Sequence, residues 1–118
     1  MTLEAYKFLR EPARLAPGTI LNVVTGYYGL QKEDITGPSA RREISRARDV
    51  TMYFMRELTP LTFQEIAREL GRNHHQPVIL GHRKIDNLLK ANDEELVEEV
   101  TTMRESLEAA VQPTYHPH

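Results

Sequence analysis

A short turn between two helical patterns constrains the fold of this chain more than any other feature. Thr62 and Glu65 form a Thr-x-x-Glu capping box, and apolar residues follow them at helical spacing. Gly71 can adopt the left-handed conformation that ends a helix. Five polar residues, 72–76, and Pro77 follow, and the apolar pattern resumes at Val78. Residues 58–85 therefore predict a helix, a tight turn and a second helix that begins in polar residues.

Apolar periodicity and capping residues predict helices through the rest of the chain as well. We expect a short helix over residues 2–9, a helix from a Thr19 cap to Gly29, a single turn at Ile35 and a long helix closed by Pro60. The predicted fold class is all-α.

A final helix is predicted after residue 91, where Asn92 or Asp93 can act as the N-cap. Its apolar residues form a seam, which can pack on the core of the same domain, the alternative we favour, or against a second copy or another protein. Because its many glutamates repel DNA, the helix is expected to lie away from any basic face. The seam residues are Leu96, Val100, Met103 and Leu107.

Charge is segregated along the chain, although the net charge is only −2. Residues 38–90 hold ten Lys or Arg against six Asp or Glu, whereas residues 91–118 hold one Arg against seven acids. A basic middle suits a surface that approaches phosphate, and an acidic end suits a surface kept for another purpose. The plain alternative for each segment is a solvated helix face without a partner.

Composition limits the classes of function. The 118 residues suit one domain without a nucleotide-hydrolysing module, and no Gly-x-x-x-x-Gly-Lys phosphate loop occurs. Cysteine is absent, and the histidines, including His74, His75 and His82, lack metal-ligand spacing, so we expect neither an enzyme nor a metal or other cofactor. No apolar run approaches the roughly 20 residues of a membrane helix, and no secretory leader is recognised. We expect a cytoplasmic, nucleoid-associated protein without a membrane partner.

Several residues between positions 19 and 89 occur in the order of a known family. They are Tyr27, Tyr28, Arg46, Arg48, Arg56, Glu57, Leu58, Thr59, Glu65, Ile66, Arg83, Lys84 and Ile85. On these residues the chain resembles the C-terminal DNA-binding domain of the bacterial replication initiator DnaA. The resemblance implies a Trp-repressor-like helix-turn-helix bundle of five to six helices that binds double-stranded DNA. The acidic C-terminal helix lies beyond the resemblance as an extra element.

The turn departs from the pattern of that family. Where the family reads Gly-Gly-Arg-Asp-His-Thr-Thr-Val, this chain reads Gly-Arg-Asn-His-His-Gln-Pro-Val over residues 71–78. The family uses this motif to contact phosphates and bases, so the resemblance implies a shared scaffold but a different DNA target. Since proline fits only the first turn of a helix, Pro77 predicts that the second helix begins at His75 or Gln76.

Two segments are candidate DNA contacts. The first is a basic loop over residues 41–46, in which the resemblance places Arg46 at the arginine that the family inserts into the minor groove. The second is the turn with the start of the second helix, where Asn or Gln can bond adenine in the major groove. A solvated loop and a plain capping turn are the alternatives. The predicted DNA-binding residues are Arg41, Arg42, Arg46, Arg48, Arg72, Asn73, His74, His75, Gln76, Arg83 and Lys84.

The predicted organisation is an N-terminal helical arm over residues 1–18, a helix-turn-helix domain over 19–90, an acidic helix over 91–111 and a disordered tail over 112–118. We expect stand-alone binding of double-stranded DNA in replication or transcription control. Two alternatives remain open. One is a non-enzymatic modulator of the replication machinery that kept the fold but lost sequence-specific DNA binding, with replication proteins or a second copy as partners. The other is a phage or mobile-element protein that uses the domain at its own origin.

Overall fold

The computed structural model describes residues 15–110, which form six helices without a strand. The predicted all-α fold class is therefore confirmed. The predicted helix over residues 2–9 and the predicted tail over 112–118 lie outside the described residues. The helices are α2 (Pro17–Tyr28), α3 (Lys32–Thr36), α4 (Arg42–Leu58), α5 (Phe63–Glu69), α6 (Gln76–Lys90) and α7 (Glu94–Ala110).

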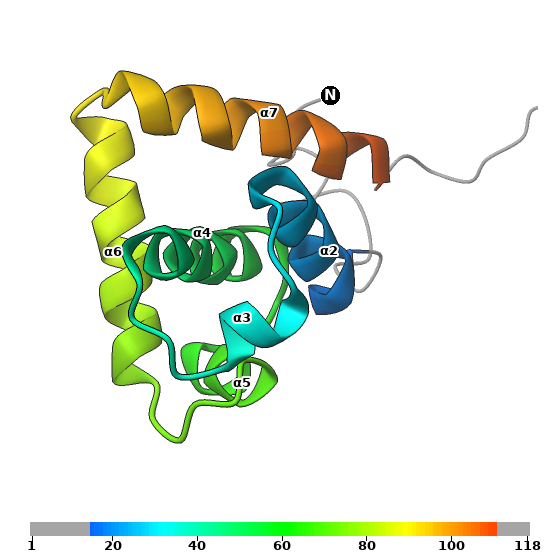
Figure 1. Cartoon of the computed structure of the whole chain (residues 1–118), viewed down its shortest axis with the longest axis vertical. Helices are drawn as coiled ribbons and strands as arrows, with labels where there is room; N and C mark the ends of the chain where they lie inside the picture. Colours follow the sequence, from blue (N-terminus) through cyan, green and yellow to red (C-terminus); the bar gives the residue numbers. More distant parts are fainter. Residues whose placement is uncertain (1–14, 111–118) are drawn as a thin grey trace, which may run out of the picture.

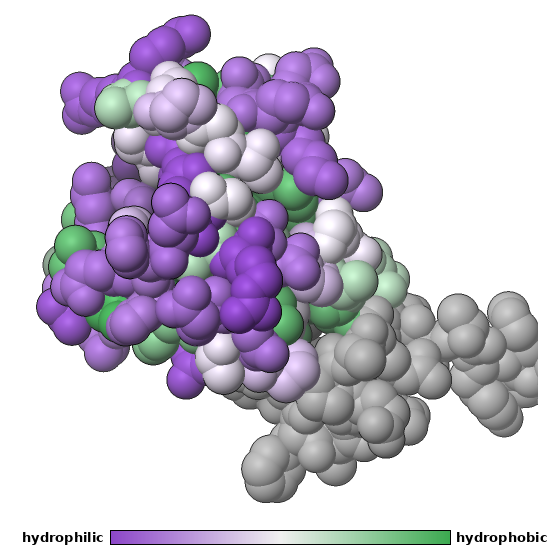
Figure 2. Space-filling model, turned by 90° about the horizontal axis from the view of Figure 1, so that it is seen from below, coloured by the Kyte–Doolittle hydropathy of each residue, from purple (hydrophilic) through white to green (hydrophobic). Residues whose placement is uncertain are grey.

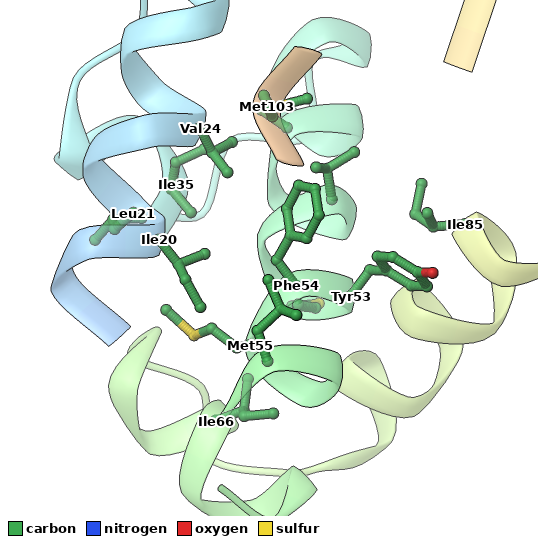
Figure 3. Packing of buried hydrophobic residues seen from close by; sticks show 14 of the residues in the cluster. Ile20, Leu21, Val24, Ile35, Tyr53, Phe54, Met55, Ile66, Ile85 and Met103 are labelled. Carbon is green, nitrogen blue, oxygen red and sulfur yellow. The ribbon is translucent and has the colours of Figure 1, made fainter. Parts of the chain in front are cut away.

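Helix α4 is the centre of the bundle (Figure 1). It packs against α2, α3, α5 and α6, and its residues from Met52 to Met55 are all buried. In Figure 3, Phe54 lies at the centre of the labelled side chains, while Tyr53 points to the side of α6, where Ile85 lies. In Figure 1, α7 crosses one end of the molecule and the α5–α6 turn lies at the opposite end. Helix α4 thus holds α6 in place, and the α5–α6 turn lies far from α7.

The apolar seam of α7 is closed within the molecule. Its four residues are at most 3% exposed and belong to the main hydrophobic cluster. This confirms the alternative in which the seam packs on the core of the same chain. Because fully burying such a side chain contributes about 1.5–3 kcal/mol, α7 stabilises the bundle substantially. The buried residues are Leu96, Val100, Met103 and Leu107.

Two predicted helix starts were wrong. Helix α2 begins at Pro17 after the N-cap Ala16, so Thr19 lies inside the first turn instead of capping it. Proline is favoured at the first helical position because its fixed φ suits the helix and its missing N–H costs nothing there. Helix α4 begins at Arg42, so most of the predicted basic loop is helical. Ile44 lies in this first turn and is buried, which is consistent with the earlier start.

The cap of α7 was left open between two residues, and the structure decides it. The Leu96 amide donates to Oδ1 of Asp93 over 2.9 Å, which is the bond of an N-cap. Asn92 precedes it with φ +62°, a left-handed conformation that asparagine tolerates better than most residues. The chain therefore reverses at Asn92, and Asp93 opens the helix.

Candidate nucleic-acid interface

Helices α5 and α6 are joined by a turn that local interactions fix at both ends. The Glu65 amide donates to Oγ1 of Thr62 over 3.1 Å, and the Thr62 amide donates to the Glu65 carboxylate over 2.8 Å, which confirms the predicted capping box. Gly71 has φ +72°, the left-handed conformation expected of it. Helix α6 begins at Gln76, as the position of Pro77 predicted.

One face of α6 is exposed while the opposite face packs against α4. Gly81 lies on the packed face, where an added Cβ would lie only 2.8 Å from Sδ of Met52 and Oδ1 of Asp49. The absence of a side chain at Gly81 therefore lets the two helices approach closely. The exposed residues include Gln76, Pro77, Leu80, Arg83, Lys84 and Asn87. Apart from Pro77 and Leu80, this face consists of hydrogen-bonding or positively charged side chains.

The turn before α6 is exposed. Asn73, His74 and His75 are all exposed, and Nδ1 of His75 lies 3.1 Å from Oε1 of Gln64 on α5. Figure 2 views the molecule from the α5 end, and hydrophilic residues dominate the visible surface. A depression brings the turn beside the loop that follows α3. It is lined by Thr36, Gly37, Pro38, Gly71, Arg72, Asn73, His74 and Pro77.

Arg48 and Arg72, both predicted contacts, donate mainly to backbone carbonyls of the last turn of α3 and of the loop that follows it. Arg48 is 9% exposed, and burial together with the neighbouring charge of Arg72 lowers its pKa. Its guanidinium donates to the carbonyl oxygens of Asp34, Ile35, Gly37 and Ser39 over 2.8–3.0 Å. The Arg72 guanidinium donates to the carbonyl oxygens of Thr36, Gly37 and Leu70 over 2.8–3.0 Å. The two side chains thus fasten this loop to the helix-turn-helix.

Arg46 is engaged by the acidic helix. Its Nε donates to Oε1 of Glu99 over 2.9 Å, and one terminal nitrogen lies 3.9 Å from Oε1 of Glu95. The Tyr28 hydroxyl donates to the same oxygen of Glu99 over 2.5 Å. Burial and this hydrogen bond raise the pKa of the Tyr28 phenol. The expectation that α7 lies away from the basic segment was therefore wrong at Arg46, because a carboxylate of α7 neutralises its charge.

The remaining predicted cations are on the surface. Arg41 and Arg42 are exposed at the start of α4, where Nε of Arg41 lies 3.3 Å from Glu43. Arg83 and Lys84 are exposed on α6, and Nζ of Lys84 lies 4.0 Å from Asp49. The Arg41–Glu43 pair is exposed on both sides and is therefore held weakly, whereas Asp49 is largely buried beneath the exposed Lys84. These four side chains are accessible to an anionic ligand.

His82 is part of the α4–α6 contact. Its Nε2 lies 2.8 Å from Oε2 of Glu57, and its ring stacks on Tyr53 with the centroids 5.3 Å apart. Phe63 meets the ring edge-on. Over residues 15–110, no three His, Asp or Glu side chains gather in a way that could hold a metal ion. His82 is thus turned away from the histidines of the exposed turn by its packing.

Sequence reasoning missed Leu80 and the structural role of Arg48 and Arg72. Leu80 is 49% exposed on the outer face of α6. Its spacing from Val78 and Ile85 could have indicated this, since the buried face of α6 runs through positions 78, 81 and 85. No local signal indicates the partners of Arg48, because they lie nine to fourteen residues earlier and meet it only in the folded chain.

The capped α5, the left-handed Gly71 and the exposed face of α6 define the class of this protein as a helix-turn-helix domain. The family described as the bacterial DnaA protein helix-turn-helix matches residues 17–85. The chain belongs to this family.

Individual relatives agree with that assignment. The chromosomal replication initiator protein DnaA of Ruegeria sp. (strain TM1040) is 40% identical over 86 residues, which cover 73% of this chain and 18% of the relative. The protein of the same name from Gloeothece citriformis is 40% identical over 80 residues, which cover 68% of this chain and 18% of that relative. The DnaA protein of Cereibacter sphaeroides is 36% identical over 86 residues, which cover 73% of this chain and 19% of that relative. The similarity thus covers less than a fifth of each relative.

Proposed function

We propose that this chain is a double-stranded DNA-binding protein that acts in replication or transcription control without catalysing a reaction. The observation that carries this proposal is the exposed face of α6, which begins in the polar turn and continues through Arg83 and Lys84. Membership of the DnaA helix-turn-helix family supports the proposal. We further propose that it acts in the cytoplasm. None of the helices over residues 15–110 is long and apolar enough to cross a membrane.

In this proposal α6 enters the major groove, as the second helix of a helix-turn-helix does. Asn73, His75 and Gln76 reach base edges from the turn, because amide and imidazole groups can donate and accept there. Arg83 and Lys84 contact phosphates further along the helix. His74 lies on the same exposed turn and has the same capacity for hydrogen bonds.

The arginines at the start of α4 and the two that bond to backbone carbonyls have different roles in the proposal. Arg41 and Arg42 contact phosphate directly, since both are exposed. Arg46 contacts DNA only after exchanging Glu99 for a phosphate. Arg48 and Arg72 act as positioning residues, because most of their donors are already bonded to backbone carbonyls, mainly of α3 and the loop after it.

The test is a fluorescence anisotropy titration of a labelled random-sequence duplex of about 30 base pairs over a range of salt concentrations. We expect the wild-type affinity to fall steeply with salt, because each phosphate contact contributes roughly −0.9 to the log–log slope. The charge reversal Arg83→Glu should abolish most of the binding. Lys90→Glu is the matched control, since Lys90 is an exposed cation at the far end of α6 that pairs with Asp86 at 2.8 Å. Absence of wild-type binding at low salt would contradict the proposal.

The second candidate is a non-enzymatic modulator of the replication machinery. The contact between Arg46 and Glu99 favours it, since α7 neutralises a cation that a DNA-binding surface would use. This candidate predicts that selection from a random duplex library yields no enriched motif, but that the intact chain captures a replication protein. Such a selection therefore separates the two candidates.

A further inference from the structure

Leu80 is an apolar side chain in the middle of a polar face. It is 49% exposed, and the other large hydrophobic residue exposed within residues 15–110 is Tyr27 on α2, at 41%. Gln76 lies one helical turn before Leu80, and Arg83 and Lys84 lie one turn after it. All three neighbours are exposed. The core of this protein does not account for a leucine at this position.

We propose that Leu80 is a specificity-determining residue that packs on the C5-methyl group of a thymine in the major groove. This inference rests on the proposed function, since it requires α6 to lie in that groove. The thymine methyl is the apolar group that the base edges present there, whereas the remaining groups donate or accept hydrogen bonds. A leucine cannot satisfy those groups and would bury them at a cost. An A·T pair therefore suits Leu80 better than a G·C pair.

Charge and helix geometry favour duplex DNA as the ligand of this side chain. Arg83 and Lys84 make the surroundings of Leu80 positive, which attracts a polyanion and disfavours burial against an apolar protein surface. Along the helix, four residues rise about 6 Å, close to the roughly 6.8 Å of two base-pair steps. Contacts of Gln76 and Leu80 are thus expected about two base pairs apart, with adenine suited to Gln76 and thymine to Leu80.

The experiment begins with selection of preferred sites from a random duplex library by the full chain. In the selected duplex, each thymine is then replaced in turn by deoxyuridine, which removes only the methyl group. We expect one position at which the replacement weakens wild-type binding about fourfold, the effect of roughly one buried methyl group. Leu80→Ala should bind the two duplexes equally at that position. Tyr27→Ala, the matched control, should keep the fourfold difference, and circular dichroism should show both variants folded.

Three results would overturn the assignment of Leu80. They are a library without an enriched motif, equal wild-type affinity for thymine and deoxyuridine at every position, and a difference that persists in Leu80→Ala. Salt-dependent binding to unselected duplex distinguishes this failure from that of the proposed function. If that binding remains while thymine and deoxyuridine are equivalent, the protein binds DNA and only the role of Leu80 is wrong. If that binding is absent, both proposals fail.

Discussion

The N-terminal half of α4 and the outer face of α6 are both rich in cations, but the protein uses these cations differently. In α4, Arg48 is buried and donates to backbone carbonyls, and Arg46 donates to a carboxylate of α7. On α6, Arg83 and Lys84 remain exposed to solvent. A high density of arginine in the sequence therefore does not identify the surface that can meet phosphate. The internal partners that folding brings to each guanidinium decide it.

The largest expected effect is on stability, at Arg48. We expect Arg48→Ala to lower the free energy of unfolding by about 3 kcal/mol, because the carbonyl oxygens of Asp34, Ile35 and Ser39 lose the guanidinium that donates to them. Arg48→Lys should restore little, since an ammonium group lacks the planar fork that serves four carbonyls. Urea unfolding followed by circular dichroism measures the change. A free energy of unfolding within about 0.5 kcal/mol of wild type would show that Arg48, like the exposed cations of α6, contributes little to stability.

At Arg83 we expect the reverse, a loss of DNA affinity without a loss of stability. Arg83→Ala should leave the unfolding midpoint unchanged, because an exposed side chain away from the core contributes little to stability. The free energy of duplex binding should become less favourable by about 1 kcal/mol. The slope of log affinity against log salt concentration should become shallower by roughly 0.9. Anisotropy and urea unfolding of the same preparation test both halves. A destabilised variant with normal affinity would remove Arg83 from the interface.

A smaller effect is expected where α4 meets α7. We expect Glu99→Gln to strengthen duplex binding about two- to threefold at low salt, because the charge that competes with phosphate for Arg46 is gone. In the double variant with Arg46→Ala this gain should vanish. The comparison of the four proteins in one anisotropy series isolates the coupling. If the gain persists without Arg46, α7 repels DNA as a whole and Arg46 is only a structural residue.

The smallest effect concerns alkaline pH. Burial and the bond to Glu99 raise the pKa of Tyr28 in the folded chain, whereas the unfolded chain has the ordinary value of about 10. The unfolded state therefore loses this proton first, and stability falls as pH rises above about 10 toward the folded value. Tyr28→Phe should make the decline between pH 9 and 11 shallower. Urea midpoints across that range measure it, and an identical slope would show that Tyr28 does not contribute.

Local interactions explain which parts of the fold could be predicted. The capping box of Thr62 and Glu65, the reversal at Gly71 and the start of α6 beside Pro77 each depend on residues within one helical turn. The seam of α7 was recognised for the same reason, since helical spacing alone places its apolar residues on one side. The prediction failed at Arg42, where a run of charged residues concealed the buried Ile44.

The sequence by itself determined the helices, the turn between α5 and α6 and the apolar faces, because backbone propensity and side-chain spacing act over a few neighbouring residues. Only the tertiary structure decided which polar groups remain available. Arg46 meets Glu99 across 53 positions of sequence, and Arg72 meets the carbonyl of Thr36 across 36. These partners come together only when the helices pack, so no local pattern encodes them.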